Sequence, residues 1–140
     1  MKLTVIPMPF SEVCDKYTIA CIKLEKMLDS DAGKGDVKRI EFQKDELFRG
    51  VSGLLDLLDT NDKKKAEDAL QQLKDANMTV WNAESDLRRG RDGEMTMEEV
   101  GRRCLVARDA NKYRVAAKNI MCELAGEGNW KDIKTNHASA

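Results

Sequence analysis

The sequence predicts an all-α protein, an antiparallel four-helix bundle with a short extended N-terminal arm, and three observations support this. The composition favours helices, because charged residues make up 35% of the 140 residues and there are only 2 prolines. Apolar residues recur with the helical period in four long segments. Residues that start and stop helices separate these segments, so short connections would join antiparallel neighbours.

The first two expected helices follow each other across a glycine-containing loop. The first is expected at Glu12–Leu28, with Ser11 as its N-cap. The second is expected at Val37–Leu58. Gly50 and Gly53 would each weaken its middle by roughly 1 kcal/mol relative to alanine, so we expect close packing, a kink or a split there.

The other two expected helices have clearer boundaries. The third is expected at Lys63–Arg89, capped by the Thr-Asn-Asp that precedes it. A capping box, formed by Thr96 and Glu99, opens the fourth helix, Met97–Ala125. Gly126 would close this helix as its C-terminal glycine.

The two ends of the chain are expected to be less regular, within a single domain that spans residues 1–140. Residues 1–10 would form an extended arm, because Lys2–Ile6 favours a β conformation and two prolines follow it. Residues 127–140 would form a short polar tail, anchored by Trp130.

Charge and hydropathy exclude several classes of protein. The net charge is −1, from 24 basic and 25 acidic residues, whereas nucleic-acid binders usually show a basic excess. No segment approaches the roughly 20 apolar residues of a membrane span, and no signal peptide is recognisable. We therefore expect a cytoplasmic protein. The cysteines are expected to be reduced and buried; they are Cys14, Cys21, Cys104 and Cys122.

Polar residues interrupt the apolar stripe of the third expected helix. Spacings of 4, 3 and 4 place four residues on one face: Asn77, Trp81, Glu84 and Arg88. A buried amide or carboxylate costs free energy unless it is paired. One interpretation is a ligand site, in which Trp81 stacks while Asn77 and Glu84 bind polar edges. The other is structural, with Trp81 in the core and an ion pair between Glu84 and Arg88.

The fourth expected helix offers partners for this polar face, namely Arg108, Asn111, Lys112, Arg114 and Lys118. Arg114 and Lys118 are like charges four residues apart, which is mildly destabilising unless an anionic group lies between them. Arginine suits bidentate recognition of carboxylate or phosphate. The alternative is a solvated face that pairs with acidic residues of neighbouring helices.

Three segments resemble an uncharacterised helical family of bacterial and phage proteins of unknown function. The patterns are DKxTIxxIKxE at residues 15–25, NxxxWxxExxLR at 77–88 and ARxxNxxRxxxK at 107–118. They occur in the same order as in the family, whereas residues 29–75 and the tail depart from it. The resemblance implies a small helical cytoplasmic protein and no assigned activity. The polar positions described above lie within these segments, which favours a shared ligand pocket.

The leading hypothesis is a non-catalytic binding protein, without a metal or cofactor, for a small anionic ligand such as a nucleotide-derived molecule. Arg108, Arg114 and Lys118 would meet the negative charge, Asn111 would bind a polar edge, and the further candidates are Lys16 and Lys23. One concrete version is a phage protein that sequesters a host nucleotide signal. We also expect a homo-oligomer, because elongated bundles often bury apolar surface by self-association.

Two alternatives stay open. The first is a structural or interaction protein, in which the polar residues form a satisfied buried network. The second is a magnesium-dependent nucleotide phosphohydrolase, which needs several convergent carboxylates. Three carboxylate pairs have metal-like spacing: Glu12 with Asp15, Glu25 with Asp29, and Glu84 with Asp86. The ExxE helix of all-α nucleotide pyrophosphohydrolases is absent from the sequence.

Overall fold

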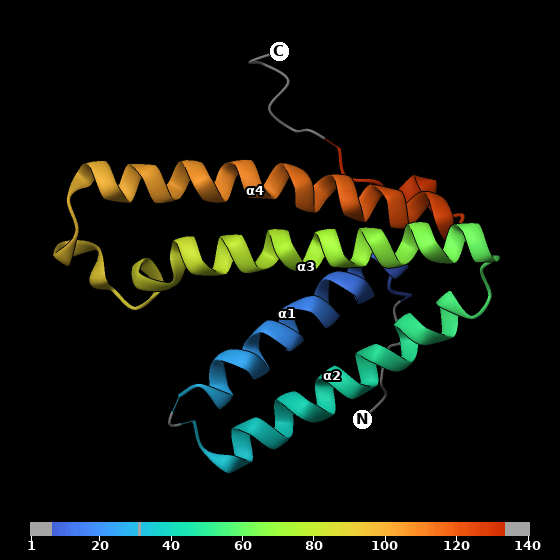
Figure 1. Ribbon diagram of the computed structural model, residues 1–140, viewed down its shortest axis with the longest axis horizontal. Helices are drawn as coiled ribbons and strands as arrows, with labels where there is room; N and C mark the ends of the chain where they lie inside the picture. The colour runs from blue at the N-terminus through green and yellow to red at the C-terminus, as the bar shows by residue number, and fades with distance from the viewer. Residues whose placement is uncertain (1–6, 31, 134–140) are drawn as a thin grey trace.

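The computed structural model describes residues 7–30 and 32–133, which form four long α-helices and two short 3₁₀ helices and contain no strand (Figure 1). The helices are α1 (Phe10–Leu28), α2 (Lys34–Leu55), α3 (Thr60–Arg88), η1 (Arg91–Glu94), α4 (Met97–Leu124) and η2 (Gly128–Trp130). The predicted all-α bundle is thereby confirmed. The β-favouring segment Lys2–Ile6 lies outside the described residues.

The helices form two hairpins in which consecutive helices run in opposite directions (Figure 1). Helices α3 and α4 lie side by side along most of their length, and the α1–α2 hairpin is inclined across one side of them. Helix α1 contacts the other three long helices, whereas α2 packs mainly against α1. Helix α1 is therefore the element on which contacts between the two hairpins depend.

The hydrophobic core lies where the four helices meet. Its buried members are Phe10, Cys14, Val51, Ala69, Leu73, Ala117 and Met121. Most buried residues of the α3–α4 pair are alanines, including Ala66, Ala76, Ala83, Ala107 and Ala110. Short side chains let two helix axes approach closely, because interaxial distance depends on the side chains at the contact. The core is thus assembled from a few large residues and a closely packed alanine seam.

Helix α1 begins two residues earlier than the sequence suggested. Pro9 occupies the N-cap position and offers no side-chain cap, so the prediction that Ser11 caps this helix is wrong. The backbone N–H of Phe10 instead donates to the Glu127 carboxylate at 3.0 Å. Ser11 is buried, and its Oγ accepts a bond from Cys122 Sγ at 3.3 Å. Residues distant in sequence therefore complete this helix end.

The caps of the other helices agree better with the sequence. The Asp59 carboxylate accepts from the backbone N–H of Asp62 at 2.8 Å, so α3 begins three residues earlier than expected. The predicted Thr-Asn-Asp cap is therefore wrong, because these three residues form the first turn of α3. Thr96 accepts from the N–H of Glu99 at 3.1 Å, which confirms the predicted start of α4. Gly126 has φ 70° directly after the last turn of α4, which confirms its predicted closing role.

Helix α2 is continuous through both of its interior glycines, without a break. A Cβ atom at Gly50 would lie 3.2 Å from Val13 Cγ1, so α1 approaches the backbone of α2 closely at this point. A Cβ atom at Gly53 would meet nothing within 4 Å. Close packing therefore accounts for Gly50 and leaves Gly53 unexplained.

This difference predicts that alanine stabilises the protein more at Gly53 than at Gly50. Gly53→Ala should raise the free energy of unfolding by up to about 1 kcal/mol, because alanine restricts the unfolded chain and meets open space. Gly50→Ala should raise the free energy of unfolding by less, because Val13 must move to make room for the methyl group. Urea denaturation of both variants measures the difference. Equal stabilisation would show that the contact with Val13 imposes no constraint.

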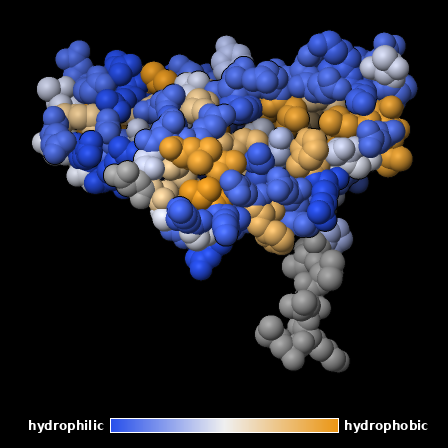
Figure 2. All heavy atoms as spheres, turned by 60° about the horizontal axis from the view of Figure 1, so that its bottom comes forward, coloured by the Kyte–Doolittle hydropathy of each residue, from blue (hydrophilic) through white to orange (hydrophobic). Residues whose placement is uncertain are grey.

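Several large apolar side chains remain on the surface. Figure 2 looks onto the side of the α1–α2 hairpin and shows hydrophobic residues interspersed among hydrophilic ones. Phe42 is 67% exposed and Leu57 is 81% exposed. The expectation of four buried thiols is wrong for two of them, because Cys104 is exposed and Cys21 is only partly buried, although all four cysteines are free. Across residues 7–30 and 32–133, each helix is too short or too polar to cross a membrane.

Candidate functional site

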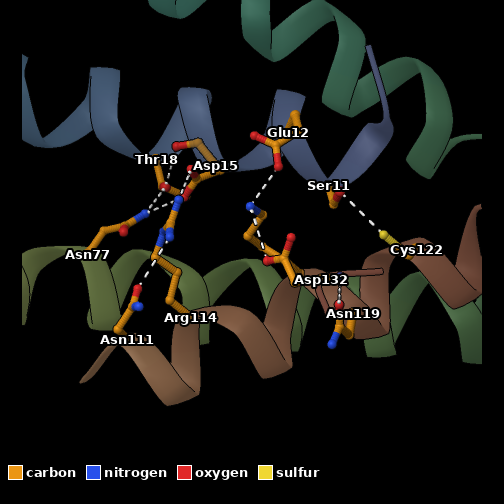
Figure 3. Close-up of polar contacts among 11 residues, drawn as sticks. Ser11, Glu12, Asp15, Thr18, Asn77, Asn111, Arg114, Asn119, Cys122 and Asp132 are labelled. Atoms are coloured by element: carbon orange, nitrogen blue, oxygen red, sulfur yellow. Dashed lines mark hydrogen bonds and ion pairs between the residues drawn. The ribbon is translucent and has the colours of Figure 1, made fainter. Parts of the chain in front are cut away.

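A buried carboxylate links three of the helices. Asp15 of α1 is only 4% exposed and lies between α3 and α4 (Figure 3). Arg114 of α4 donates to both of its oxygens, from Nε at 3.1 Å and from Nη2 at 2.6 Å. Asn77 Nδ2 of α3 donates to Asp15 Oδ1 and to Thr18 Oγ1, both at 2.9 Å. Asn111 completes the cluster by accepting from Arg114 Nη1 at 3.3 Å.

This network explains the amide in the apolar stripe of α3. Asn77 lies on a buried face, as its spacing predicts, but its expected partners were all on α4. Its direct partners are instead Asp15 and Thr18 of α1, which were not predicted. A signal existed, because Ser11, Asp15, Thr18 and Ile22 recur at helical spacing on one face of α1, and all four are buried.

Burial and hydrogen bonding act in opposite directions on the pKa of Asp15. Burial raises this pKa, but hydrogen bonds from Arg114 and Asn77 outweigh burial and hold it below its ordinary value of 3.8. The carboxylate in turn raises the pKa of Arg114. Burial, with a smaller effect of Asp15, also raises the pKa of the neighbouring Cys14 thiol to about 12. Cys14 is therefore protonated near neutral pH and is a poor nucleophile.

A second buried charge lies one turn further along α4. Lys118 is 6% exposed, and its Nζ lies 2.6 Å from Glu12 Oε1 and 3.6 Å from Asp132 Oδ2. The backbone N–H of Asp132 also donates to Asn119 Oδ1 at 3.1 Å (Figure 3). Polar contacts hold this part of the tail, whereas Trp130 is 59% exposed and does not anchor it.

The remaining predicted residues fall outside the buried network. Arg88 lies over the ring of half-buried Trp81, 5.2 Å from its centroid, and forms the expected ion pair with Glu84 at 2.9 Å. Arg108 is exposed and binds its neighbour Asp109 at 3.1 Å. Lys16 is also exposed. The structure therefore divides the predicted residues between a buried network, the Trp81 side of α3 and the open surface.

One cleft brings together two of the predicted residues, Lys23 and Trp81. It measures about 310 Å³ and lies between the C-terminal parts of α1 and α3, which diverge towards these ends (Figure 1). Its lining residues are Lys23, Lys26, Met27, Ser30, Trp81 and Arg89. Lys26 Nζ donates to Asn82 Oδ1 at 3.2 Å. Lys26 was not among the predicted residues; the available signal was a basic residue in the last turn of α1.

Five of the six carboxylates with metal-like spacing bind basic side chains instead of converging. Their ion pairs are Glu12–Lys118, Asp15–Arg114, Glu25–Lys74, Glu84–Arg88 and Asp86–Arg103. Within the described residues, no group of three or more His, Cys, Asp or Glu side chains could hold a metal ion.

Comparisons with protein-family models, curated proteins and solved structures found no match. The family resemblance of the three sequence segments therefore stays a prediction.

Proposed function

We propose that this protein is a non-catalytic binding protein for a small anionic ligand with a planar ring, such as a nucleotide-derived molecule. The ligand would occupy the cleft between the C-terminal parts of α1 and α3, called the basic cleft below. The observation that carries the proposal is the convergence of Lys23, Lys26 and Arg89 on a cleft that Trp81 also lines.

The charge of the basic cleft favours an anion. Three of its six lining residues are cationic, and none is acidic. A cleft lined by one sign of charge concentrates counter-ions of the opposite sign. Lysine can bind phosphate as a point charge, and arginine can bind two phosphate or carboxylate oxygens at once.

Trp81 would supply the contact with the planar part of the ligand. Base–aromatic stacking is worth about 1–3 kcal/mol per base. Arg88 already lies over the Trp81 ring, and Glu84 holds Arg88 in position. The guanidinium therefore covers one face of the indole that lines the cleft, with its charge offset by Glu84. A volume of about 310 Å³ falls at the lower end of the range typical of small-molecule sites.

The basic cleft is a better candidate than the basic residues of α4. Arg114 and Lys118 already bind carboxylates of their own chain, at 2.6 Å to Asp15 and 2.6 Å to Glu12. An incoming anion would have to displace these buried partners. Lys23 has no such contact among the described residues, so its charge is available to a ligand.

Tryptophan fluorescence tests the proposal directly, because the chain has only 2 tryptophans. In a Trp130→Phe background, ATP should change the emission of Trp81. Lys23→Ala and Arg89→Ala should each weaken binding about tenfold, the effect of losing roughly 1.4 kcal/mol. Inorganic phosphate, titrated separately by calorimetry, should bind more weakly than ATP because it lacks a ring.

Arg108→Ala is the matched control, because it removes one positive charge from the exposed surface of α4. It should leave binding unchanged. Loss of binding in Arg108→Ala, with Lys23→Ala unaffected, would locate the site on α4 and refute the basic cleft. The proposed function would be refuted if the emission of Trp81 stayed unchanged both with ATP and with the phosphorylated small molecules released from the purified protein.

A structural or interaction protein is the second candidate, and one observation favours it. In the described residues, every buried side-chain nitrogen and oxygen has a hydrogen-bond partner. A fully satisfied network can stabilise one helix arrangement without any ligand. On this alternative, ATP and phosphate would bind neither the wild-type protein nor its variants.

A further inference from the structure

A groove of about 670 Å³ lies between α3 and α4, and its volume is about twice that of the basic cleft. This volume falls within the range typical of small-molecule sites, about 300–1,000 Å³. Ala76 of α3 and Ala110 of α4 line the groove from its two sides, together with Val106. Because the two alanines are buried and short, they leave an apolar hollow between the helices, called the α3–α4 groove below.

The α3–α4 groove faces away from the α1–α2 hairpin. Asn77 points towards α1, where it binds Asp15. The groove residues Asp75 and Thr79 are each two positions from Asn77, and two positions correspond to about 200° around a helix. The groove is thus distinct from both the basic cleft and the buried network.

Every charged residue that lines the α3–α4 groove is acidic, but only one of the carboxylates lacks a basic partner. Asp68 and Asp109 are each paired with a basic residue of their own helix, at 2.9 Å and 3.1 Å. Asp75 forms no ion pair within residues 7–30 and 32–133, and its Oδ1 accepts from the neutral amide of Gln71 at 2.9 Å. The groove therefore keeps one uncompensated negative charge, at Asp75.

Asp75 lies near the middle of the groove, with an aromatic ring towards one end. Helices α3 and α4 run antiparallel, and Gln72 Nε2 donates to the backbone oxygen of Tyr113 at 3.4 Å (Figure 1). One turn beyond Asp75, Thr79 and Val106 line the other end. Tyr113 is 64% exposed, so its ring is accessible to a bound molecule. A ligand could therefore reach the carboxylate and the ring at the same time.

We propose that the α3–α4 groove binds a small organic cation that carries an apolar ring, such as an arylalkylamine. Its ammonium group would donate to the Asp75 carboxylate, and its ring would lie on the alanine floor beside Tyr113. The face of a tyrosine ring also attracts cations. A cation with a single charge fits better than a polyamine, because a polyamine would need the carboxylates that are already paired.

This inference is independent of the function proposed for the basic cleft. The two sites have opposite charges, since the basic cleft has three cationic lining residues and the α3–α4 groove has none. An anion would find no basic side chain in the groove, and an amine would be repelled from the basic cleft. Each site can therefore be tested without the other.

A titration with 1-naphthylmethylamine, followed by two-dimensional NMR of the ¹⁵N-labelled protein, tests the site. The amine should shift the backbone amide signals of Ala76 and Ala110. In 1-naphthalenemethanol a hydroxyl replaces the ammonium, so this probe should bind about fivefold more weakly. Asp75→Asn should remove the preference for the amine, and Tyr113→Ala should weaken the binding of both probes. The same spectra show whether each variant is folded.

Glu67→Gln is the control for charge, because Glu67 is an exposed carboxylate of α3 that does not line the groove. It should leave the affinity for the amine unchanged, and the signals of Lys23 in the basic cleft should stay in place. Unshifted signals of Ala76 and Ala110 at millimolar amine would overturn the proposal. A preference for the amine that persists in Asp75→Asn, or that Glu67→Gln removes equally, would overturn it as well.

Discussion

Asp15→Ala is expected to lower the free energy of unfolding by about 2–4 kcal/mol. Removing one partner of a buried ion pair typically costs 3–5 kcal/mol, because the other charge stays buried without compensation. The Arg114 side chain is 27% exposed, so water can recover part of this loss. Asn77 would also lose an acceptor for its Nδ2. Urea denaturation monitored by circular dichroism measures the change.

Two further variants show whether burial is responsible. Asp68→Ala removes an exposed ion pair, in which the Asp68 side chain is 65% exposed and the Lys64 side chain is 72% exposed. It should change the free energy of unfolding by less than about 1 kcal/mol. The double variant Asp15→Leu with Arg114→Met should recover much of the loss, because no unpaired buried charge remains. If Asp15→Ala were as mild as Asp68→Ala, the buried network would not stabilise the fold.

The pKa of Asp15 also predicts how stability depends on pH. Its folded-state pKa lies below the ordinary value of 3.8, so its contribution to stability is fully present above about pH 4. This contribution should be lost as the pH falls through the folded-state pKa. Asp15→Asn should therefore show a weaker loss of stability than the wild-type protein below pH 4. An unchanged acid profile would contradict the lowered pKa.

Leu73→Ala is expected to be comparably severe, with a loss of about 2–5 kcal/mol in the free energy of unfolding. Leu73 is 0% exposed and belongs to the core where the four helices meet. The surrounding helices cannot fully close the cavity left by its three missing carbon atoms, so packing contacts are lost as well as apolar burial.

Leu57→Ala is the matched control, because Leu57 is 81% exposed and undergoes the same chemical change. It should alter stability by no more than about 0.5 kcal/mol. Thermal and urea denaturation of both variants give the comparison. A small loss in Leu73→Ala would mean that the core does not depend on the four-helix junction.

Local patterns were sufficient to predict the helices and several of their ends. Thr96 and Gly126 act through hydrogen bonds and φ angles within a few residues, so their roles could be inferred from neighbouring sequence. Ser11 failed as a predicted cap because a carboxylate from the other end of the chain, Glu127, binds the first turn of α1. A hydrogen bond between residues 117 positions apart leaves no signal in the sequence around the helix end.

The buried polar network was likewise predictable only in part from the sequence. The spacing of Asn77 on an apolar stripe predicted a buried amide, and the like charges of Arg114 and Lys118 predicted a need for anionic partners. The anions proved to be Asp15 and Glu12 of the same chain. Sequence spacing could not choose between an internal carboxylate and a ligand, because both satisfy the same charges.

The sequence by itself determined the helical class, the approximate helix boundaries and the burial of Asn77, because these depend on periodicity and short-range hydrogen bonding. Only the tertiary structure decided which charges neutralise one another. It also showed that Lys23 and Trp81 line one cleft. The physical reason is that these features depend on how helices cross, which the pattern within each helix does not specify.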